Sequence, residues 1–163
     1  MTPINENSII GRAEKVIFVE HNDLEVVAKI DTGADLSSLW ASDIHETEAG
    51  LTFYLFGHQS PHFLNNEVTV PKGAYHMTRI SNSFGQKEQR YVVKRKIKLQ
   101  SKIINASFTL SDRSKKTYPI LIGRRTIQGK FLVDVKRGEP LQDLENEKKS
   151  ALKEELNPSV KQL

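Results

Sequence analysis

The chain has 163 residues, of which 37% are hydrophobic and 27% charged, a balance typical of one globular domain that is long enough to bury a core. No run of about 18 apolar residues is present, which excludes a helical membrane span. No cysteine is present either, which excludes disulfides, thiol catalysis and thiolate zinc sites.

The formal net charge is +4, and the positive charge is concentrated in one stretch. Between Lys87 and Lys102, seven basic residues stand against Glu88 alone. Such a strip could attract RNA, a ribosome or an acidic peptide. No aromatic stacking pattern accompanies these charges, so we favour a solvated strand face and expect no nucleic-acid partner.

The first half of the chain predicts a series of short strands. Residues 1–8 are polar and predict a flexible N-terminus without a signal peptide, so we expect a cytoplasmic protein. Runs of apolar and β-branched residues bounded by turn formers then predict five strands, at 16–19, 24–30, 51–56, 67–70 and 75–80. The apolar spacing of residues 36–41 fits a strand or a helix, and the two are not separated here.

An amphipathic hairpin is the clearest pattern in the second half. Residues 81–86 are rich in turn formers and predict a hairpin tip. In residues 91–99 apolar side chains alternate with lysines, and Arg95 alone interrupts the apolar face. After a turn at 100–102, residues 104–110 alternate in the same way, which is a strong hairpin signal.

The end of the domain is marked by glycines. Residues 118–122 predict a buried strand that stops at Gly123, and residues 125–128 suit one or two helical turns before a last strand at 131–135. Leucines then lie among glutamates and lysines, which predicts an amphipathic helix or a disordered tail. We therefore expect a domain at 9–135 and a charged tail at 136–163.

The stretch Asp31-Thr32-Gly33-Ala34 follows an apolar strand and is the main candidate for chemistry. Gly33 permits a positive φ or a close backbone approach, and the Thr32 hydroxyl can lock the turn. Such a rigid turn would point its carboxylate outward. An ordinary strand-end aspartate is the alternative at this point.

Two motifs in this order resemble those of the retropepsins, the retroviral-type aspartic proteases. Ala-Lys-Ile-Asp-Thr-Gly-Ala at 28–34 and Tyr-Pro-Ile-Leu-Ile-Gly-Arg at 118–124 are similar to those of a bacterial retropepsin-like family. Its members are labelled ATP-dependent zinc proteases and are found alongside ribosomal-protein glutamate ligases. The resemblance implies an all-β protein, a closed β-barrel of the acid protease fold with one short helix after Gly123.

The resemblance also implies an aspartic endopeptidase acting on a protein or peptide. In this class two carboxylates about 3 Å apart share one proton, because both cannot ionise so close together. The ionised partner activates a water, and the protonated partner donates to the peptide carbonyl oxygen. The chain has a single Asp-Thr-Gly, so this mechanism requires a homodimer in which each protomer supplies Asp31.

Residue roles follow from the resemblance position by position. The expected catalytic residues are Asp31, Thr32 and Gly33. The expected substrate-binding residues are Ala34 and Asp35 with the flap tip, namely Asn82, Ser83, Phe84 and Gly85. The expected supports of the site are Leu121, Ile122, Gly123 and Arg124. Asp35 and Arg124 match an ion pair, and we predict a partly buried bidentate contact between them, with two exposed charges as the alternative.

The residues themselves give the zinc and ATP labels little support. His58 and His62 are four apart, but Pro61 lies between them, so surface histidines are the favoured interpretation and no metal is expected. No glycine-rich phosphate loop is present, so no cofactor is expected. Two other functions stay open: a non-catalytic adaptor that keeps the protease fold, linked to a glutamate ligase or ribosomal-protein modification, and a basic protein that docks on RNA.

Overall fold

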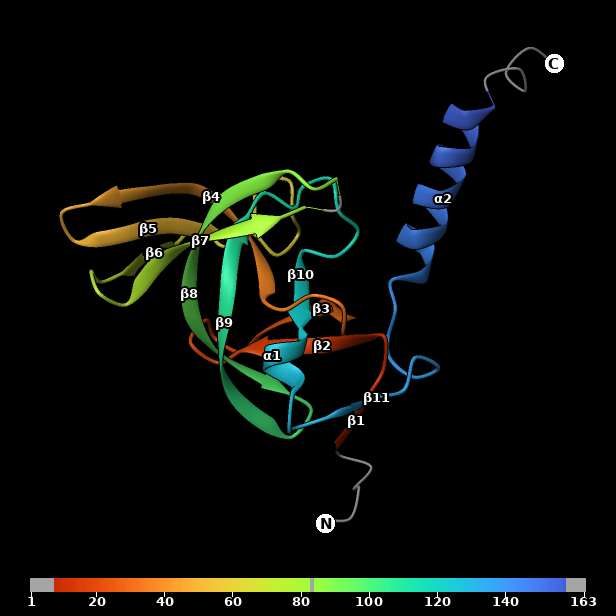
Figure 1. Cartoon of the computed structure of the whole chain (residues 1–163), viewed down its shortest axis with the longest axis horizontal. Helices are drawn as coiled ribbons and strands as arrows, with labels where there is room; N and C mark the ends of the chain where they lie inside the picture. Colours follow the sequence, from red (N-terminus) through yellow and green to blue (C-terminus); the bar gives the residue numbers. More distant parts are fainter. Residues whose placement is uncertain (1–7, 83, 158–163) are drawn as a thin grey trace.

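The centre of the molecule is a closed barrel of six strands (Figure 1). The computed structural model describes residues 8–82 and 84–157. The barrel strands follow one another in the order β10 (Ile120–Gly123), β3 (Leu24–Asp31), β2 (Ala13–Phe18), β8 (Lys87–Leu99), β9 (Lys102–Ser111) and β4 (Ser37–Thr47). Strand β4 pairs back onto β10, with Leu39 opposite Ile120, and this pairing closes the ring. The all-β, closed-barrel prediction is therefore confirmed.

The remaining elements extend from the barrel. Strands β5 (Gly50–Leu55) and β6 (Glu67–Val70) continue from β4 as an arm, and β7 (Tyr75–Ser81) pairs with β8. Strands β1 (Ile9–Ile10) and β11 (Leu132–Val133) form a short parallel pair. Helix α1 (Arg124–Ile127) follows β10, and α2 (Gln142–Leu156) stands beside the barrel and points away from it (Figure 1).

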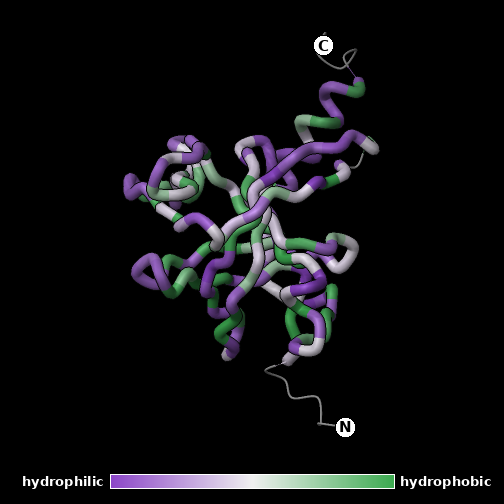
Figure 2. Tube along the Cα trace, turned by 60° about the vertical axis from the view of Figure 1, so that its left-hand side comes forward, coloured by the Kyte–Doolittle hydropathy of each residue, from purple (hydrophilic) through white to green (hydrophobic). Residues whose placement is uncertain are grey.

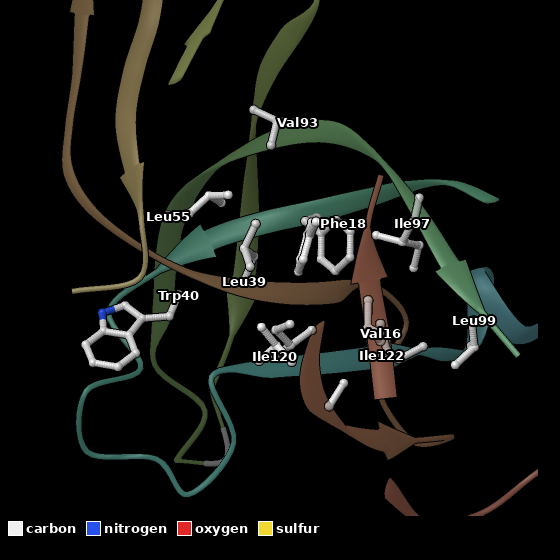
Figure 3. Packing of buried hydrophobic residues seen from close by; sticks show 14 of the residues in the cluster. Val16, Phe18, Leu39, Trp40, Leu55, Val93, Ile97, Leu99, Ile120 and Ile122 are labelled. Carbon is white, nitrogen blue, oxygen red and sulfur yellow. The ribbon is translucent and has the colours of Figure 1, made fainter. Parts of the chain in front are cut away.

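Alternating side chains of β8 and β9 help to fill the barrel. On β8, Val93, Ile97 and Leu99 are buried and Tyr91 is half-buried, whereas the lysines are exposed as the sequence predicts. Phe18, Leu39 and Ile120 come from three different strands and lie together inside the barrel (Figure 3). Burying each such side chain contributes about 1.5–3 kcal/mol, so this shared interior is what holds distant strands in register.

The segment at 36–41, which fitted either a strand or a helix, lies at the start of β4. It is a strand because it has partners on both sides: β9 in parallel, with Ser37 opposite Phe108, and β10 in antiparallel orientation. Arg95, the exception on the apolar face of β8, is half-buried. It lies over the Phe53 ring at 5.7 Å and pairs with Glu20 at 3.3 Å.

Two predicted bounds need correction near the C-terminus. Helix α1 begins at Arg124 and ends at Ile127, and β11 covers only Leu132–Val133. The shorter β11 follows from its parallel pairing with β1, because β1 itself has two residues.

Of the two alternatives for the tail, the structure has a helix, which is mixed in hydropathy along its length (Figure 2). Helix α2 is tied to the barrel by Glu145, which accepts hydrogen bonds from Arg12 at 2.8 Å and from the Tyr118 hydroxyl at 2.5 Å. These donors hold the pKa of Glu145 below its usual range. No helix in the described ranges is long and apolar enough to cross a membrane. Residues 1–7 of the predicted flexible N-terminus lie outside the described residues.

Candidate active site

Asp31 is the last residue of β3, and its carboxylate helps to shape the turn that follows. The side chain is half-buried, and its Oδ1 accepts a hydrogen bond from the Gly33 amide at 3.0 Å. A Cβ on Gly33 would lie 3.3 Å from that same oxygen. The sequence suggests two possible reasons for a glycine at position 33, a positive φ angle or a close approach of other atoms. The close approach applies, because the φ angle of Gly33 is not positive. Thr32 is exposed, and its hydroxyl has no hydrogen-bond partner within the described residues.

Strand β10 supports this turn directly from the side. It runs parallel to β3 and places Gly123 opposite Asp31. A Cβ on Gly123 would lie 2.6 Å from the carbonyl carbon and oxygen of Leu36, so a larger residue would collide with backbone. The Arg124 amide donates to the Ala34 carbonyl at 2.8 Å and ties the helix start to the turn.

Behind the turn lies a buried hydroxyl network that the sequence analysis missed. The Ser37 hydroxyl accepts from the Gly123 amide at 3.0 Å and shares a hydrogen bond with the Thr126 hydroxyl at 2.8 Å. Both side chains are buried. Since an unpaired buried amide would cost about 1–3 kcal/mol, the network helps to fix Gly123 beside Asp31. A serine and a threonine at strand and helix ends carry no distinctive sequence signal.

The predicted bidentate ion pair exists, but with a different arginine. Arg125 contacts the Asp35 carboxylate with two nitrogens, Nε at 3.0 Å and Nη2 at 2.8 Å. Arg124 has one longer contact with Asp35, at 3.4 Å, and donates a hydrogen bond to the Gly33 carbonyl at 3.2 Å. The pair is also exposed, with 43% of the Asp35 side chain and 66% of the Arg125 side chain accessible. The prediction of a partly buried Arg124 fork is wrong because α1 brings Arg125 into line with Asp35, whose carbonyl accepts the Arg125 amide.

A cleft of about 570 Å³ opens between the Asp31 turn and strand β7. Four residues predicted for the site line it, namely Gly33, Ala34, Asp35 and Leu121. Ile122 instead points into the buried core, as Figure 3 shows.

The predicted hairpin tip forms beyond the end of β7. The Asn82 side-chain oxygen accepts from the amides of Phe84 at 3.0 Å and Gln86 at 2.9 Å, and Gly85 takes a φ of +76°. Asn82, Phe84 and Gly85 do not line the cleft of a single chain, and Phe84 is 89% exposed. Ser83 lies outside the described residues.

Arginines are the cleft residues that sequence reasoning missed. Arg79, Arg90 and Arg113 line it together with Arg125. Arg90 belonged to the basic strip that was read as a solvated face, and Arg113 lies in a polar loop with no pattern of its own. Burial and the nearby charge of Arg90 lower the pKa of Arg113 to about 10, while the opposite charge of Asp31 partly compensates.

The two histidines considered for zinc, His58 and His62, differ in how far they are exposed. His58 is exposed, whereas His62 is half-buried with its ring 5.9 Å from that of Phe56. His62 is thus only partly exposed, and burial lowers the pKa of its imidazole. The described residues contain no group of three or more histidines, aspartates or glutamates that could hold a metal ion.

A closed barrel, an Asp-Thr-Gly turn at the end of β3 and an Ile-Leu-Ile-Gly strand beside it define the retropepsin-like class of fold. Residues 9–142 match the RimB-like family, described as "Retropepsin-like aspartic endopeptidase RimB". The chain belongs to this family, which confirms the resemblance drawn from the two motifs.

Known proteins similar to this chain include a solved structure of similar length and longer proteins named as ligases. A solved structure from Legionella pneumophila, a protein with unknown function (DUF785), shares 30% identity at a TM-score of 0.62 and covers 82% of this chain and 97% of its own. A probable alpha-L-glutamate ligase of Desulfotalea psychrophila is 27% identical over 128 residues, and one of Shewanella pealeana is 31% identical over 132. Each match covers 77% of this chain but only 28% of the ligase.

Proposed function

We propose that this chain is an aspartic endopeptidase that hydrolyses peptide bonds through a dyad of two Asp31 side chains in a homodimer. The observation that carries the proposal is the placement of Asp31. A half-buried carboxylate ends a barrel strand, its turn is held by Gly123 and Ser37, and a cleft opens beside it. Family membership supports the same conclusion.

The chemistry follows from bringing two such turns together. Two carboxylates about 3 Å apart hold one proton between them, so one remains a base and the other an acid. The base takes a proton from a water that attacks the peptide carbonyl, and the acid donates to the carbonyl oxygen. The exposed Thr32 hydroxyl is available to brace the two turns against each other.

Replacing the acid tests the proposal. Asp31→Asn should reduce cleavage of a peptide or protein substrate at mildly acidic pH by at least about a hundredfold, the usual contribution of acid–base catalysis. A statine-type transition-state mimic should inhibit the unaltered chain, and Asp143→Asn on the exposed face of α2 is the matched control. Sedimentation should show a dimer for all three chains. Full activity in Asp31→Asn, or in a chain that stays monomeric, would contradict the dyad.

A second candidate rests on the relatives. In both ligases the matching segment makes up 28% of a longer protein, so this domain occurs joined to a glutamate ligase. An adaptor that keeps the protease fold and binds such a ligase in the cytoplasm, in connection with ribosomal-protein modification, would fit this arrangement. Asp31→Asn separates the two functions: an adaptor should still alter the activity of a purified glutamate ligase when Asp31 is replaced, whereas a peptidase should not.

A further inference from the structure

A second groove, of about 510 Å³, lies between helix α2 and the barrel. Its lining residues come from three separate parts of the chain, namely the beginning of the barrel at β2 and β3, the loop that precedes β10, and α2 itself. Of the lining side chains, six are basic: Arg12, Lys29, Arg113, Lys116, Lys148 and Lys149. The fold thus gathers positive charge from segments that are far apart in the sequence.

The negative charge at this groove is already used. Within the described residues, Glu145 is the single acid that lines it. Arg12 contacts Glu145 Oε1 at 2.8 Å, and the Tyr118 hydroxyl donates to the same oxygen. Lys149 acts on Glu145 only from a longer range, and none of the four lysines forms an ion pair with an acid in the part of the chain that the structure describes. Repulsion among these lysines is unfavourable unless an anion lies between the two walls.

Helix α2 is attached to the barrel only near its N-terminal end. It has no buried residue, and after Glu145 the next contact is that of Lys148 Nζ, which donates to the Lys115 carbonyl at 3.0 Å. Beyond Lys148, no helix residue that the structure describes hydrogen-bonds to the barrel, and the helix points away from it (Figure 1). A ligand that contacts both walls would hold the C-terminal half of α2 as well.

The kind of cation at this groove favours phosphate over carboxylate. Both arginines have their forks engaged, Arg12 with Glu145 and Arg113 through its Nε–H on the Tyr118 carbonyl. The groups left over are lysine ammoniums, which act as compact point charges and suit phosphate oxygens. An exposed lysine gains little from a single carboxylate. A phosphate group instead carries a charge of about −1.5 to −2 in a small volume, so several lysines can share it.

We propose that the groove between α2 and the barrel binds an oligophosphate, a compact anion of linked phosphate groups, which bridges Lys29 and Lys116 on the barrel and the lysines of α2. The groove volume lies in the range of small-ligand sites, roughly 300–1,000 Å³. The recognised group is the linked phosphates, whether they are free or carried by a nucleoside. This site is separate from the chemistry of Asp31 and does not depend on the peptidase proposal.

The test titrates the 163-residue chain with inorganic tripolyphosphate in a calorimeter, at physiological salt and without divalent cations. A blocked peptide of four glutamates has a similar total charge and should bind this groove at least about tenfold more weakly, because its charges are spread over separate side chains. A nucleoside triphosphate distinguishes the two sources of the phosphates. It should bind within about threefold of tripolyphosphate, because Tyr118, the only aromatic residue that lines the groove within the described residues, is buried and cannot stack on a base.

Variants assign the binding to the two walls. Lys116→Gln on the barrel and Lys149→Gln on the helix should each weaken tripolyphosphate binding by about fivefold, and the double variant by about twentyfold if the two contacts are independent. Lys153→Gln is the matched control, because it removes the same charge from an exposed position of α2 that does not line the groove. It should change binding by less than about twofold.

Hydrogen exchange tests whether the ligand bridges the walls. Saturating tripolyphosphate should slow amide exchange in residues 149–156 of α2 by about fivefold, because opening of the helix end then requires release of the ligand. In Lys116→Gln, whose change lies on the barrel, this protection should be reduced at the same ligand concentration. All of these lysines are exposed, so the variants are expected to fold normally.

Three results would overturn the site. The first is an equal loss in Lys153→Gln and Lys149→Gln, which would mean general attraction to a basic surface. The second is tighter binding of the glutamate peptide, or of a single-stranded RNA, with the same dependence on Lys116 and Lys149. The third is unchanged exchange in α2 at saturating tripolyphosphate. None of these measurements involves cleavage, so the peptidase proposal stands or falls separately.

Discussion

The Asp31 turn and the hairpin tip, formed by Asn82 and residues 84–86, are held in different ways. The turn is fixed from behind by a parallel strand, a buried hydroxyl network and the Arg124 amide. The tip is held by contacts within itself, chiefly those of the Asn82 side chain, and its Phe84 ring is almost fully exposed.

This difference suggests a division of labour between the two regions. Catalytic groups need fixed geometry, and a turn packed against the barrel core can unfold only when the core does. A cover that admits substrate needs a local and low-cost opening, which self-contained hydrogen bonds on an exposed hairpin allow. The comparison therefore predicts that equivalent changes in the two regions have unequal consequences.

The largest difference is expected between two glycine substitutions. Gly123→Ala should lower the free energy of unfolding by about 3 kcal/mol, because the new Cβ meets the Leu36 backbone at 2.6 Å. Gly85→Ala meets nothing within 4 Å and should cost only about 1 kcal/mol for its positive φ. Urea denaturation of both variants measures this. Equal losses would mean that the turn is no more tightly built than the tip.

A smaller and local effect is expected at Asn82. Asn82→Ala removes the acceptor for the Phe84 and Gln86 amides, so these two amides should exchange with solvent about fivefold faster, which corresponds to about 1 kcal/mol. Global stability should hardly change. Asn105→Ala, an exposed asparagine on β9, is the control and should leave exchange at the tip as it was. Slow exchange in Asn82→Ala would show that something else holds the tip.

The smallest effect is expected from the surface ion pair beside the turn. Asp35→Asn should reduce stability by no more than about 1 kcal/mol, because its contacts with Arg124 and Arg125 are exposed. The loss should shrink further at high salt. Thermal unfolding at low and high salt checks this, with Asp143→Asn as the control. A loss of several kcal/mol that salt does not alter would restore the pair to the structural role that the sequence predicted.

Much of the fold could be predicted because its signals are local. Alternation along 91–99 and 104–110 places each side chain on one face of a strand whatever lies beyond it. The Asp31 turn was found because a short, specific motif needs particular residues for its own backbone geometry. Residues 36–41 could not be assigned, because the strand pairing of residues 37–40 is with partners more than 65 positions away, around Phe108 and Ile120.

By itself, the sequence determined that Asp31 ends a strand, that Gly33 and Gly123 belong beside it, and that a hairpin lies between them in the chain. Only the tertiary structure decided that Arg125 rather than Arg124 makes the bidentate contact with Asp35, that Ser37 supports Gly123, and that Arg90 and Arg113 line the same cleft. The physical reason is the distance along the chain over which each kind of interaction acts. Alternation and turn chemistry act between neighbours in the chain, whereas these contacts depend on how barrel closure brings distant strands and loops together.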